Sequence, residues 1–377
     1  MDFDLNNVRA ALDEDRLSGL PLELILEILS RVDTKLAIQT CLLLFPRWKL
    51  FWTLLPSLKF SNSGIKTLAD FSKFVTHVLS HRNHQVEVSS VNLCFHGEAA
   101  QGFVKEIANY AFSHNVHELI VYSTTRNECP PSLFKSQTLK HLTFRTSVYA
   151  LCLTPKTPWD FPALTTLYLK DMSLCDDRRE SLDLFSKCVN LQNLTLENIT
   201  VEAKVLEIIT PRLANLRLDN NRGYNINVIA HQLVNLTIIQ CSIGDLNIPS
   251  GLSSFCYKGY HTPHWFKNWH FSVNKVTVSL RIYGKRSEDA RRFINMFQDL
   301  HSVRFLTLNL DIVECISSFS DLLSAQPSPF RNLISLNIDS GSRDTCKVKM
   351  STKARNFFLE NSPDATIFMK ELPTRKQ

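Results

Sequence analysis

The chain has 377 residues, of which 44% are hydrophobic and 21% charged, and this composition excludes a largely disordered protein. The 42 basic and 36 acidic residues leave a net charge of +6, and the basic residues are scattered rather than clustered as in nucleic-acid-binding proteins. No apolar run approaches the length of about 18 residues that a membrane span requires. We therefore expect neither nucleic acid nor a membrane as a partner.

The ten cysteines lie between Cys41 and Cys346 and form no C-x-x-C pair and no tight cluster with histidine. This spacing is typical of reduced, mostly buried thiols, and it predicts no metal site and no cofactor. The N-terminus is acidic and lacks the pattern of a signal peptide. The expected location is therefore the cytoplasm, the nucleus or both.

Residues 1–14 form a short polar lead, and a strongly apolar segment follows from Asp15 to Trp52. Apolar residues recur there at helical spacing on two faces of one predicted helix. The first stripe consists of Leu24, Ile25, Ile28, Leu29 and Val32, and the second consists of Leu22 and Leu26. A short helix with two apolar faces can bury one in its own core and offer the other to a partner protein.

Helix-start and helix-stop residues divide this segment into three predicted helices. Pro21 suits the first turn of the first helix, and Asp33 or Thr34 can cap a second helix that runs to about Leu44. Pro46 disfavours helix at the residue before it. A short third helix then carries Trp48 and Trp52, which are four residues apart and share one face.

Several short motifs occur in a fixed order along this segment: Asp15-Arg16-Leu17-Ser18, Leu20-Pro21, Ile28-Leu29-Ser30, Thr34-Lys35, Arg47-Trp48 and Phe51-Trp52. In this order they resemble the F-box, the module that docks a substrate receptor on the Skp-type adaptor of a cullin-RING ubiquitin ligase. The resemblance implies that Trp48 holds the module together. It also implies that the adaptor-binding residues are Leu20, Pro21, Leu24, Ile28 and Leu29.

A turn-rich connector follows the F-box segment, and the spacing of apolar residues predicts a helix from about residue 65 to residue 80. From there the template apolar-x-x-apolar-x-apolar repeats at intervals of about 19 to 30 residues, which is the range of leucine-rich repeats. The repeats start at Val88, Val116, Leu139, Leu164, Leu191, Leu213, Leu233, Leu252, Val273, Val303 and Leu333.

Each repeat contains a short strand whose alternate side chains point inward. One such strand cannot bury its apolar residues alone, so stacked repeats form a continuous core and a parallel sheet along a concave face. The asparagine ladder typical of the family is weak, with Asn221 and Cys241 at its position. The whole arrangement resembles the plant family of F-box/leucine-rich-repeat proteins, which implies an α/β fold in which helices and loops cover the outside of an irregular solenoid.

The intervals between strands predict three return helices, over residues 102–111, 180–188 and 287–300, the last capped by Ser287. A final helix at 354–359 and a strand at 365–369 are expected to close the array. The predicted domains are a lead (1–14), an F-box (15–60), the solenoid with its preceding helix (61–350) and a C-terminal cap (351–377).

The sequence contains no catalytic motif, so we expect a protein that is not an enzyme. His77, His81 and His84 are spaced to share a helix face, but no cysteine or carboxylate accompanies them at ligand spacing, and a solvated face is the simpler interpretation. The aromatic run from His261 to His270 fits either a partner-anchoring loop or local core packing.

The third, fifth and seventh places of each repeat point to the concave surface, where tyrosine, arginine and both charge signs suit protein recognition. The candidate target-binding residues are Arg145, Tyr168, Lys170, Glu197, Arg217, Asp219 and Lys258.

Two functional hypotheses follow. The first is a non-catalytic substrate receptor of an SCF-type (Skp–cullin–F-box) ubiquitin ligase, which binds a Skp-type adaptor, through it a cullin, and an unknown target protein. The second is a repeat-based interaction scaffold or small-ligand sensor in which the F-box is vestigial. Adaptor binding distinguishes the two.

Overall fold

The computed structural model describes residues 19–44, 48–97, 101–123, 135–146, 152–153, 158–174, 180–260, 273–282, 284, 286–324, 326–340 and 350–370. The chain divides into two compact units, residues 1–151 and 152–377. The predicted lead and the aromatic run at 261–270 lie outside the described residues. No helix in the described ranges combines the length and the apolar character needed to cross a membrane.

The first unit begins with the helices α2 (Leu22–Ser30) and α3 (Thr34–Leu44) of the predicted F-box, followed by the short 3-10 helix η2 (Phe51–Leu54). The first two predicted helices are thus confirmed, whereas the third is a 3-10 helix that includes Trp52 but not Trp48. At the start of α3, the Asp33 carboxylate accepts a hydrogen bond from the Lys35 N–H at 2.8 Å, so Asp33 is the cap. The core of the module is formed by Ile25, Leu29, Ala37, Cys41 and Trp48.

Four parallel strands follow in the first unit, β1 (Ser57–Ser61), β2 (Ser90–Phe95), β3 (Glu118–Ser123) and β4 (His141–Thr146). The helices α4 (Leu68–His81) and α5 (Gln101–Ser113) pack on their apolar side, where Phe74 of α4 meets Phe60 and Phe103 of α5 meets Phe95. The strand β1 was not predicted, although Leu55-x-x-Leu58-x-Phe60 fits the repeat template. The backbone N–H of Lys59 donates to the Thr34 hydroxyl at 2.8 Å, which fastens α3 to β1.

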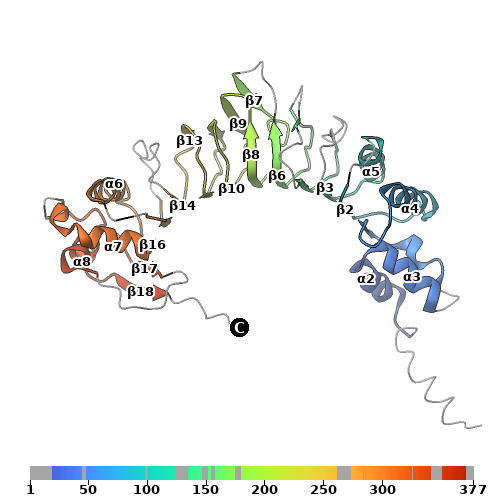
Figure 1. Ribbon diagram of the computed structural model, residues 1–377, viewed down its shortest axis with the longest axis horizontal. Coiled ribbons are helices and arrows are strands. Elements are labelled where there is room, and N and C mark those ends of the chain that lie inside the picture. The colour runs from blue at the N-terminus through green and yellow to red at the C-terminus, as the bar shows by residue number, and fades with distance from the viewer. Residues whose placement is uncertain are drawn as a thin grey trace, which may run out of the picture. The chain divides into compact units, whose positions relative to one another are not determined.

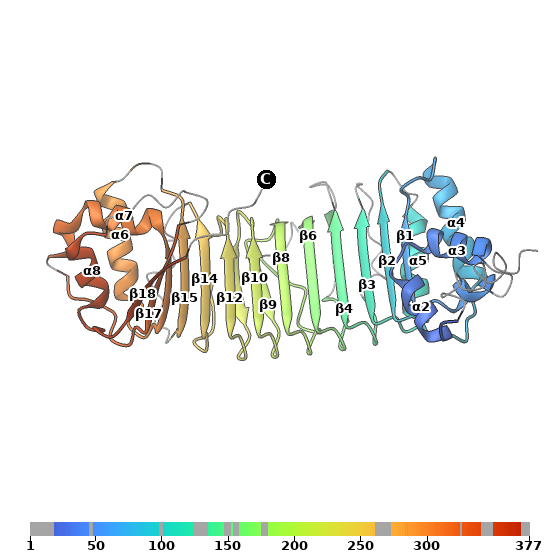
Figure 2. The same ribbon diagram turned by 90° about the horizontal axis from the view of Figure 1, so that it is seen from below.

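In the second unit, a curved sheet of parallel strands runs the length of the unit (Figures 1 and 2). The strand β5 (Cys152–Leu153) pairs with the end of the first long strand. The strands of this main sheet are β6 (Thr166–Leu174), β8 (Asn193–Val201), β10 (Asn215–Asp219), β12 (Asn235–Ile239), β14 (Ser254–Gly259), β15 (Lys275–Leu280), β16 (Phe305–Asn309), β17 (Ser335–Asp339) and β18 (Thr366–Lys370).

The predicted repeat template matches the strands of both units residue by residue. Each predicted start is buried, and a strand begins two residues after it, as Leu191 precedes Asn193 and Leu213 precedes Asn215. Equivalent leucines are paired across neighbouring strands, as Leu194 is with Leu216 and then Leu236. The stacked leucines therefore form the continuous core that a repeat array requires.

A second, smaller sheet lies on the outer side of the main sheet (Figure 1). It consists of β7 (Ser181–Asp183), β9 (Val205–Ile209), β11 (Asn225–Ile229) and β13 (Leu246–Asn247), all parallel. The predicted helix at 180–188 is therefore wrong. Leu182 and Leu184 alternate inward as in a strand, and the Asp183 carboxylate accepts the N–H groups of Phe185 and Ser186 in a turn that excludes a helix.

Helices return on the outer side at the C-terminal end: α6 (Ser287–Gln298), α7 (Leu310–Ser318), the 3-10 helix η5 (Ser320–Leu323) and α8 (Thr352–Leu359). Phe297, Phe330 and Phe358 pack together with ring centroids 5.7 to 5.9 Å apart. The predictions of α6, α8 and β18 are confirmed, but α7 was missed. Ser287 is the first helical residue rather than a cap.

Candidate functional sites

The helix α2 turns two apolar faces in different directions, as its sequence predicts. Ile25 and Leu29 are each 4% exposed and face the core, whereas Leu24 and Ile28 are 50% and 47% exposed. The two exposed residues are four apart and therefore adjacent on the helix surface. The sequence grouped all four in one stripe, but the structure separates them into a buried pair and an exposed pair.

The predicted adaptor-binding residues therefore divide into two sets. Pro21, Leu24 and Ile28 are exposed and Leu20 is half-buried, so these four are accessible to a partner. Leu29 is buried, and its contribution is to support α2 from within.

The helix α3 and the turn after Trp48 add exposed leucines that sequence reasoning missed. The signal was present, because Leu36 and Leu43 are seven residues apart and share a helix face. Of the fourteen exposed large hydrophobic side chains in the described ranges, seven lie between residues 22 and 50. These seven residues are Leu22, Leu24, Ile28, Leu36, Leu42, Leu43 and Leu50, and we call them the helical surface.

Trp48 holds this module together from inside, since it is buried and stacks on Phe51 with ring centroids 5.8 Å apart. The Lys59 ammonium also reaches the carbonyl of Arg31 at the end of α2, at 3.3 Å. The helical surface is therefore carried on helices that are anchored to the first strand of the sheet.

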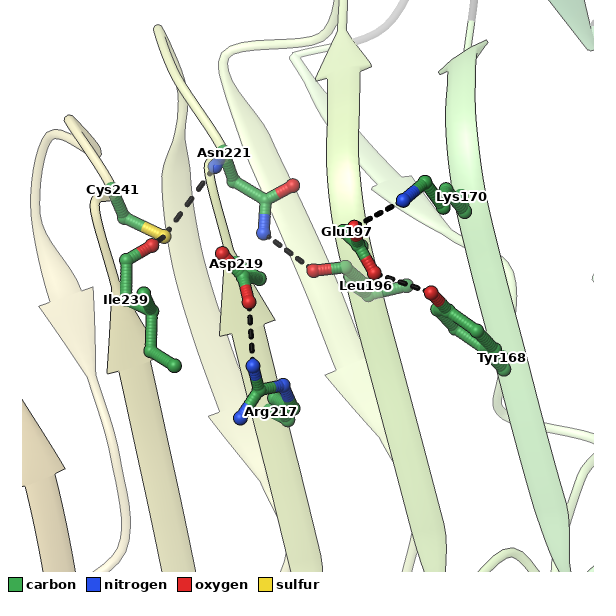
Figure 3. Close-up of polar contacts among 9 residues, drawn as sticks. All are labelled: Tyr168, Lys170, Leu196, Glu197, Arg217, Asp219, Asn221, Ile239 and Cys241. Carbon is green, nitrogen blue, oxygen red and sulfur yellow. Dashed lines mark hydrogen bonds and ion pairs between the residues drawn. The ribbon is translucent and has the colours of Figure 1, made fainter. Parts of the chain in front are cut away.

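The second candidate site is the inner face of the main sheet, formed by the side chains that alternate with the buried ones. Figure 3 shows that three side chains on adjacent strands converge there: the Tyr168 hydroxyl donates to Glu197, and the Lys170 ammonium lies 2.5 Å from the same carboxylate. On β10, the Arg217 guanidinium donates to the Asp219 carboxylate at 2.6 Å.

The charges of these five side chains neutralise one another, because two cations face two carboxylates. Lys170 and Glu197 are each 27% exposed, so their pair is partly shielded from water. The structure thus brings together five of the predicted target-binding residues. Lys258 lies further along the sheet on β14, and Arg145 belongs to the first unit, where its guanidinium lies 6.0 Å from the Tyr122 ring centroid.

Rows of hydrogen-bonded asparagine side chains cross neighbouring strands. These rows were not predicted from the sequence. On the inner face, Asn235 donates to Asn215 at 2.6 Å and Asn215 donates to Asn193 at 2.7 Å. Further along, Asn198 within β8 and Asn220 directly after β10 adopt the left-handed backbone conformation, and Asn220 donates to Asn198 at 3.1 Å. The recurrence of asparagine at the third and eighth places of successive repeats was the available signal.

The predicted position of Asn221 and Cys241 is confirmed as a structural one. The Asn221 side chain is fully buried, and its amide N–H donates to the Leu196 carbonyl at 2.8 Å (Figure 3). Its amide oxygen accepts the Ile199 N–H at 2.8 Å. The Cys241 sulfur accepts the N–H of Asn221 at 3.4 Å. Burial raises the pKa of Cys241 to about 11, so this thiol is protonated at neutral pH.

The histidines predicted to share one helix face are separated by the structure. The rings of His77 and His81 are 4.0 Å apart, whereas His84 Nδ1 lies 3.2 Å from His114 Nε2 at the end of α5. In the described ranges, no three His, Cys, Asp or Glu side chains are grouped closely enough to hold a metal ion.

Comparisons with known proteins agree with this architecture. No protein-family model matches the sequence. An F-box/LRR-repeat protein of Arabidopsis thaliana is 30% identical over 218 residues, which cover 56% of this chain and 69% of that relative. Two F-box/FBD/LRR-repeat proteins of the same plant are 33% and 29% identical over 229 and 208 residues, covering 56% and 54% of this chain and 48% and 47% of the relatives.

The chain spans about half the length of these two longer relatives. The match covers more than two thirds of the shorter relative, whose name combines an F-box with LRR repeats. The chain belongs to the plant family of F-box/LRR-repeat proteins.

Proposed function

We propose that this protein is the substrate-recognition subunit of an SCF-type ubiquitin ligase. In this proposal the F-box docks a Skp-type adaptor, and through it a cullin, while the repeats bind a target protein. The observation that carries the proposal is the helical surface, since seven large apolar side chains gather within one short segment. A surface of this kind is costly in water and is typical of a protein-binding site.

The anchoring residues in this proposal are Leu20, Pro21, Leu24 and Ile28, since the side chains at an interface that contribute most to affinity are those that become fully desolvated. Leu29 supports them from the core. The helices that carry them are fastened to β1 through Lys59, so the docking surface has a rigid base. We keep the predicted division into lead, F-box, solenoid and cap, and add that residues 57–61 are also the first strand of the sheet.

The proposed contribution to ubiquitination is positional. A receptor that binds the adaptor and a target at the same time raises the effective concentration of a target lysine near the ubiquitin-charged enzyme. In this mechanism the chain supplies no catalytic group and needs no cofactor. The proposed location remains the cytoplasm, the nucleus or both.

The test is a binding titration of the full chain against a purified Skp-type adaptor with its cullin. Deletion of residues 1–60 would remove part of β1, so point variants are the sharper tool. The combination of Leu24→Ala and Ile28→Ala should weaken binding by at least tenfold, because each anchor contributes about 1–3 kcal/mol. Val189→Ala removes an exposed apolar side chain from the second unit and should leave the affinity unchanged.

Leu29→Ala should instead lower the melting temperature, since it creates a cavity in the module. If the folded wild-type chain fails to bind any adaptor, the receptor function is wrong. The alternative, a repeat-based scaffold or small-ligand sensor with a vestigial F-box, then takes its place.

A further inference from the structure

The charge of the side chains on the inner face of the main sheet changes after β10. Four consecutive strands, β12 to β16, present twelve side chains there, and none of them is acidic. These side chains are Asn235, Thr237, Ile239, Ser254, Cys256, Lys258, Lys275, Thr277, Ser279, Phe305, Thr307 and Asn309. The two lysines therefore give this part of the face a positive charge.

Neither lysine forms an ion pair with another described residue, unlike the cations on the preceding strands. Lys170 is paired with Glu197 and Arg217 with Asp219, whereas the ion pairs among the described residues include neither Lys258 nor Lys275. Both lysines are exposed. Their charges are therefore available to an anionic partner.

The two lysines flank a common point on the sheet. They lie on adjacent strands, and because Ser254 pairs with Lys275 and Lys258 with Ser279, they are offset by four residues. This offset is roughly 13 Å along the strand direction, and Cys256 and Thr277 lie midway between them. Burial raises the pKa of the Cys256 thiol, but Lys258, Arg217 and Lys275 all oppose this rise, so the field of three cations converges at Cys256.

The floor between the lysines is low and polar, since Ser254, Cys256, Thr277 and Ser279 have short side chains. The four strands span roughly 15 Å, and an extended peptide covers that distance with about five residues. Phe305 is paired in register with Lys275 and is exposed, so an apolar side chain of the ligand can pack beside the charged one.

We propose that the inner face from β12 to β16 binds an extended segment of the target protein that carries acidic side chains, with Lys258 and Lys275 as the anchoring cations. This inference rests on the proposed function, since it names the class of target that the repeats recognise. It commits to a protein segment, because the strip of short side chains between two separated lysines fits several spaced carboxylates better than one compact anion.

The test is fluorescence anisotropy of the full chain with a fluorescein-labelled octapeptide of glutamate, compared with an octapeptide of glutamine. The glutamate peptide should bind, and the combination of Lys258→Ala and Lys275→Ala should weaken it about tenfold, as 0.5 M salt should. A matched variant, Lys187→Ala on an exposed return segment, should stay within about twofold of the wild type.

Cys256 supplies a second readout, because its modification by a thiol reagent can be followed by mass spectrometry of the digested chain. The glutamate peptide should protect Cys256, which lies between the lysines, and should leave the half-buried Cys94 of the first unit unprotected. Circular dichroism of the double variant confirms that its fold is intact.

The proposal is overturned if the double variant binds the glutamate peptide as the wild type does, or if Lys187→Ala weakens it equally. Binding of inositol hexakisphosphate at these lysines without binding of the peptide would also overturn it in favour of a small anion. Adaptor affinity, measured on the same double variant, should be unchanged. The failure of this inference is thereby distinguished from the failure of the proposed ligase function.

Discussion

The helical surface and the inner face both direct side chains away from the core, but they differ in how well those side chains are satisfied. The helical surface exposes leucine and isoleucine side chains, as Leu43 at 82% exposure illustrates. The inner face carries polar side chains, and those on β6 to β10 bond to one another. Binding at the helical surface is favoured by the burial of apolar area, whereas the inner face discriminates between partners by charge and hydrogen bonding.

The two regions therefore suit different partners. An apolar surface on a short rigid module fits one constant partner that covers it in every complex. A polar sheet face can be altered at one position without disturbing the leucines beneath, because the side chains alternate between the two faces. The predictions below test this division. The helical surface is apolar and is supported by the small core of the helical module, whereas the inner face is polar and is supported by the long stack of leucines.

The largest expected effect is the loss of Trp48, which fills the small core beneath the helical surface. Trp48→Ala should destabilise the first unit by about 3–5 kcal/mol, as other truncations of large core side chains do. Leu43→Ala is the matched control and should change stability by less than about 0.5 kcal/mol, because the side chain is exposed. The stability of both variants can be measured by chemical denaturation, followed by far-UV circular dichroism because this signal does not require the tryptophan. Equal stability of the two variants would contradict the assigned core.

The next effect concerns Asn221, which supports the inner face from the end of β10. Asn221→Ala removes the partner of the Leu196 carbonyl and the Ile199 N–H, and unpaired buried groups cost about 1–3 kcal/mol each. The expected loss is about 2–4 kcal/mol in urea denaturation. Asn235→Ala, on the exposed row, should cost less than about 0.5 kcal/mol. A similar cost for both variants would mean that the exposed row, too, is part of the structural framework.

The strands were predictable because one physical requirement governs every repeat. A strand that must bury alternate leucines against its neighbours leaves the same template each time, and Leu194 and Leu216 pair in register as that template requires. The helix α7 was missed because its apolar residues follow β16 directly, and its N-cap residue Asn309 is also the last residue of that strand. The outer strand β7 was missed because short apolar runs fit a helix or a strand equally well.

The candidate sites were less predictable, since they depend on which strands become neighbours. Sequence spacing assigned Tyr168 and Glu197 to the inner face, but only the register of β6 and β8 brings the hydroxyl to the carboxylate. Leu29 was included among the docking residues on the F-box resemblance, and only the structure shows that its side chain is buried. Lys275 occupies the third place of the predicted repeat at Val273, but only the register of β14 and β15 shows that it flanks Cys256 together with Lys258.

A smaller effect of opposite sign is expected at Tyr224, which directly precedes β11 and is buried in the core. Its hydroxyl is buried with no hydrogen-bond partner among the described residues, and burial raises its pKa. Tyr224→Phe removes an unsatisfied group and should stabilise the chain by about 0.5–1.5 kcal/mol. Tyr168→Phe is the matched change on the inner face and should destabilise slightly, because that hydroxyl donates to Glu197. The expected stabilisation is contradicted if Tyr224→Phe lowers the melting temperature more than Tyr168→Phe does.

The smallest effect concerns the ion pair on the inner face. A double-mutant cycle with Lys170→Met and Glu197→Gln should give a coupling energy of about 0.3–1 kcal/mol in urea denaturation, as partly exposed pairs do. Addition of 0.5 M salt should reduce this coupling, because screening weakens exposed pairs. A coupling above about 2 kcal/mol would assign the pair to the structural framework. A small coupling instead means that the charges on β6 and β8 can change with little cost in folding, which leaves them free to determine which partner the inner face accepts.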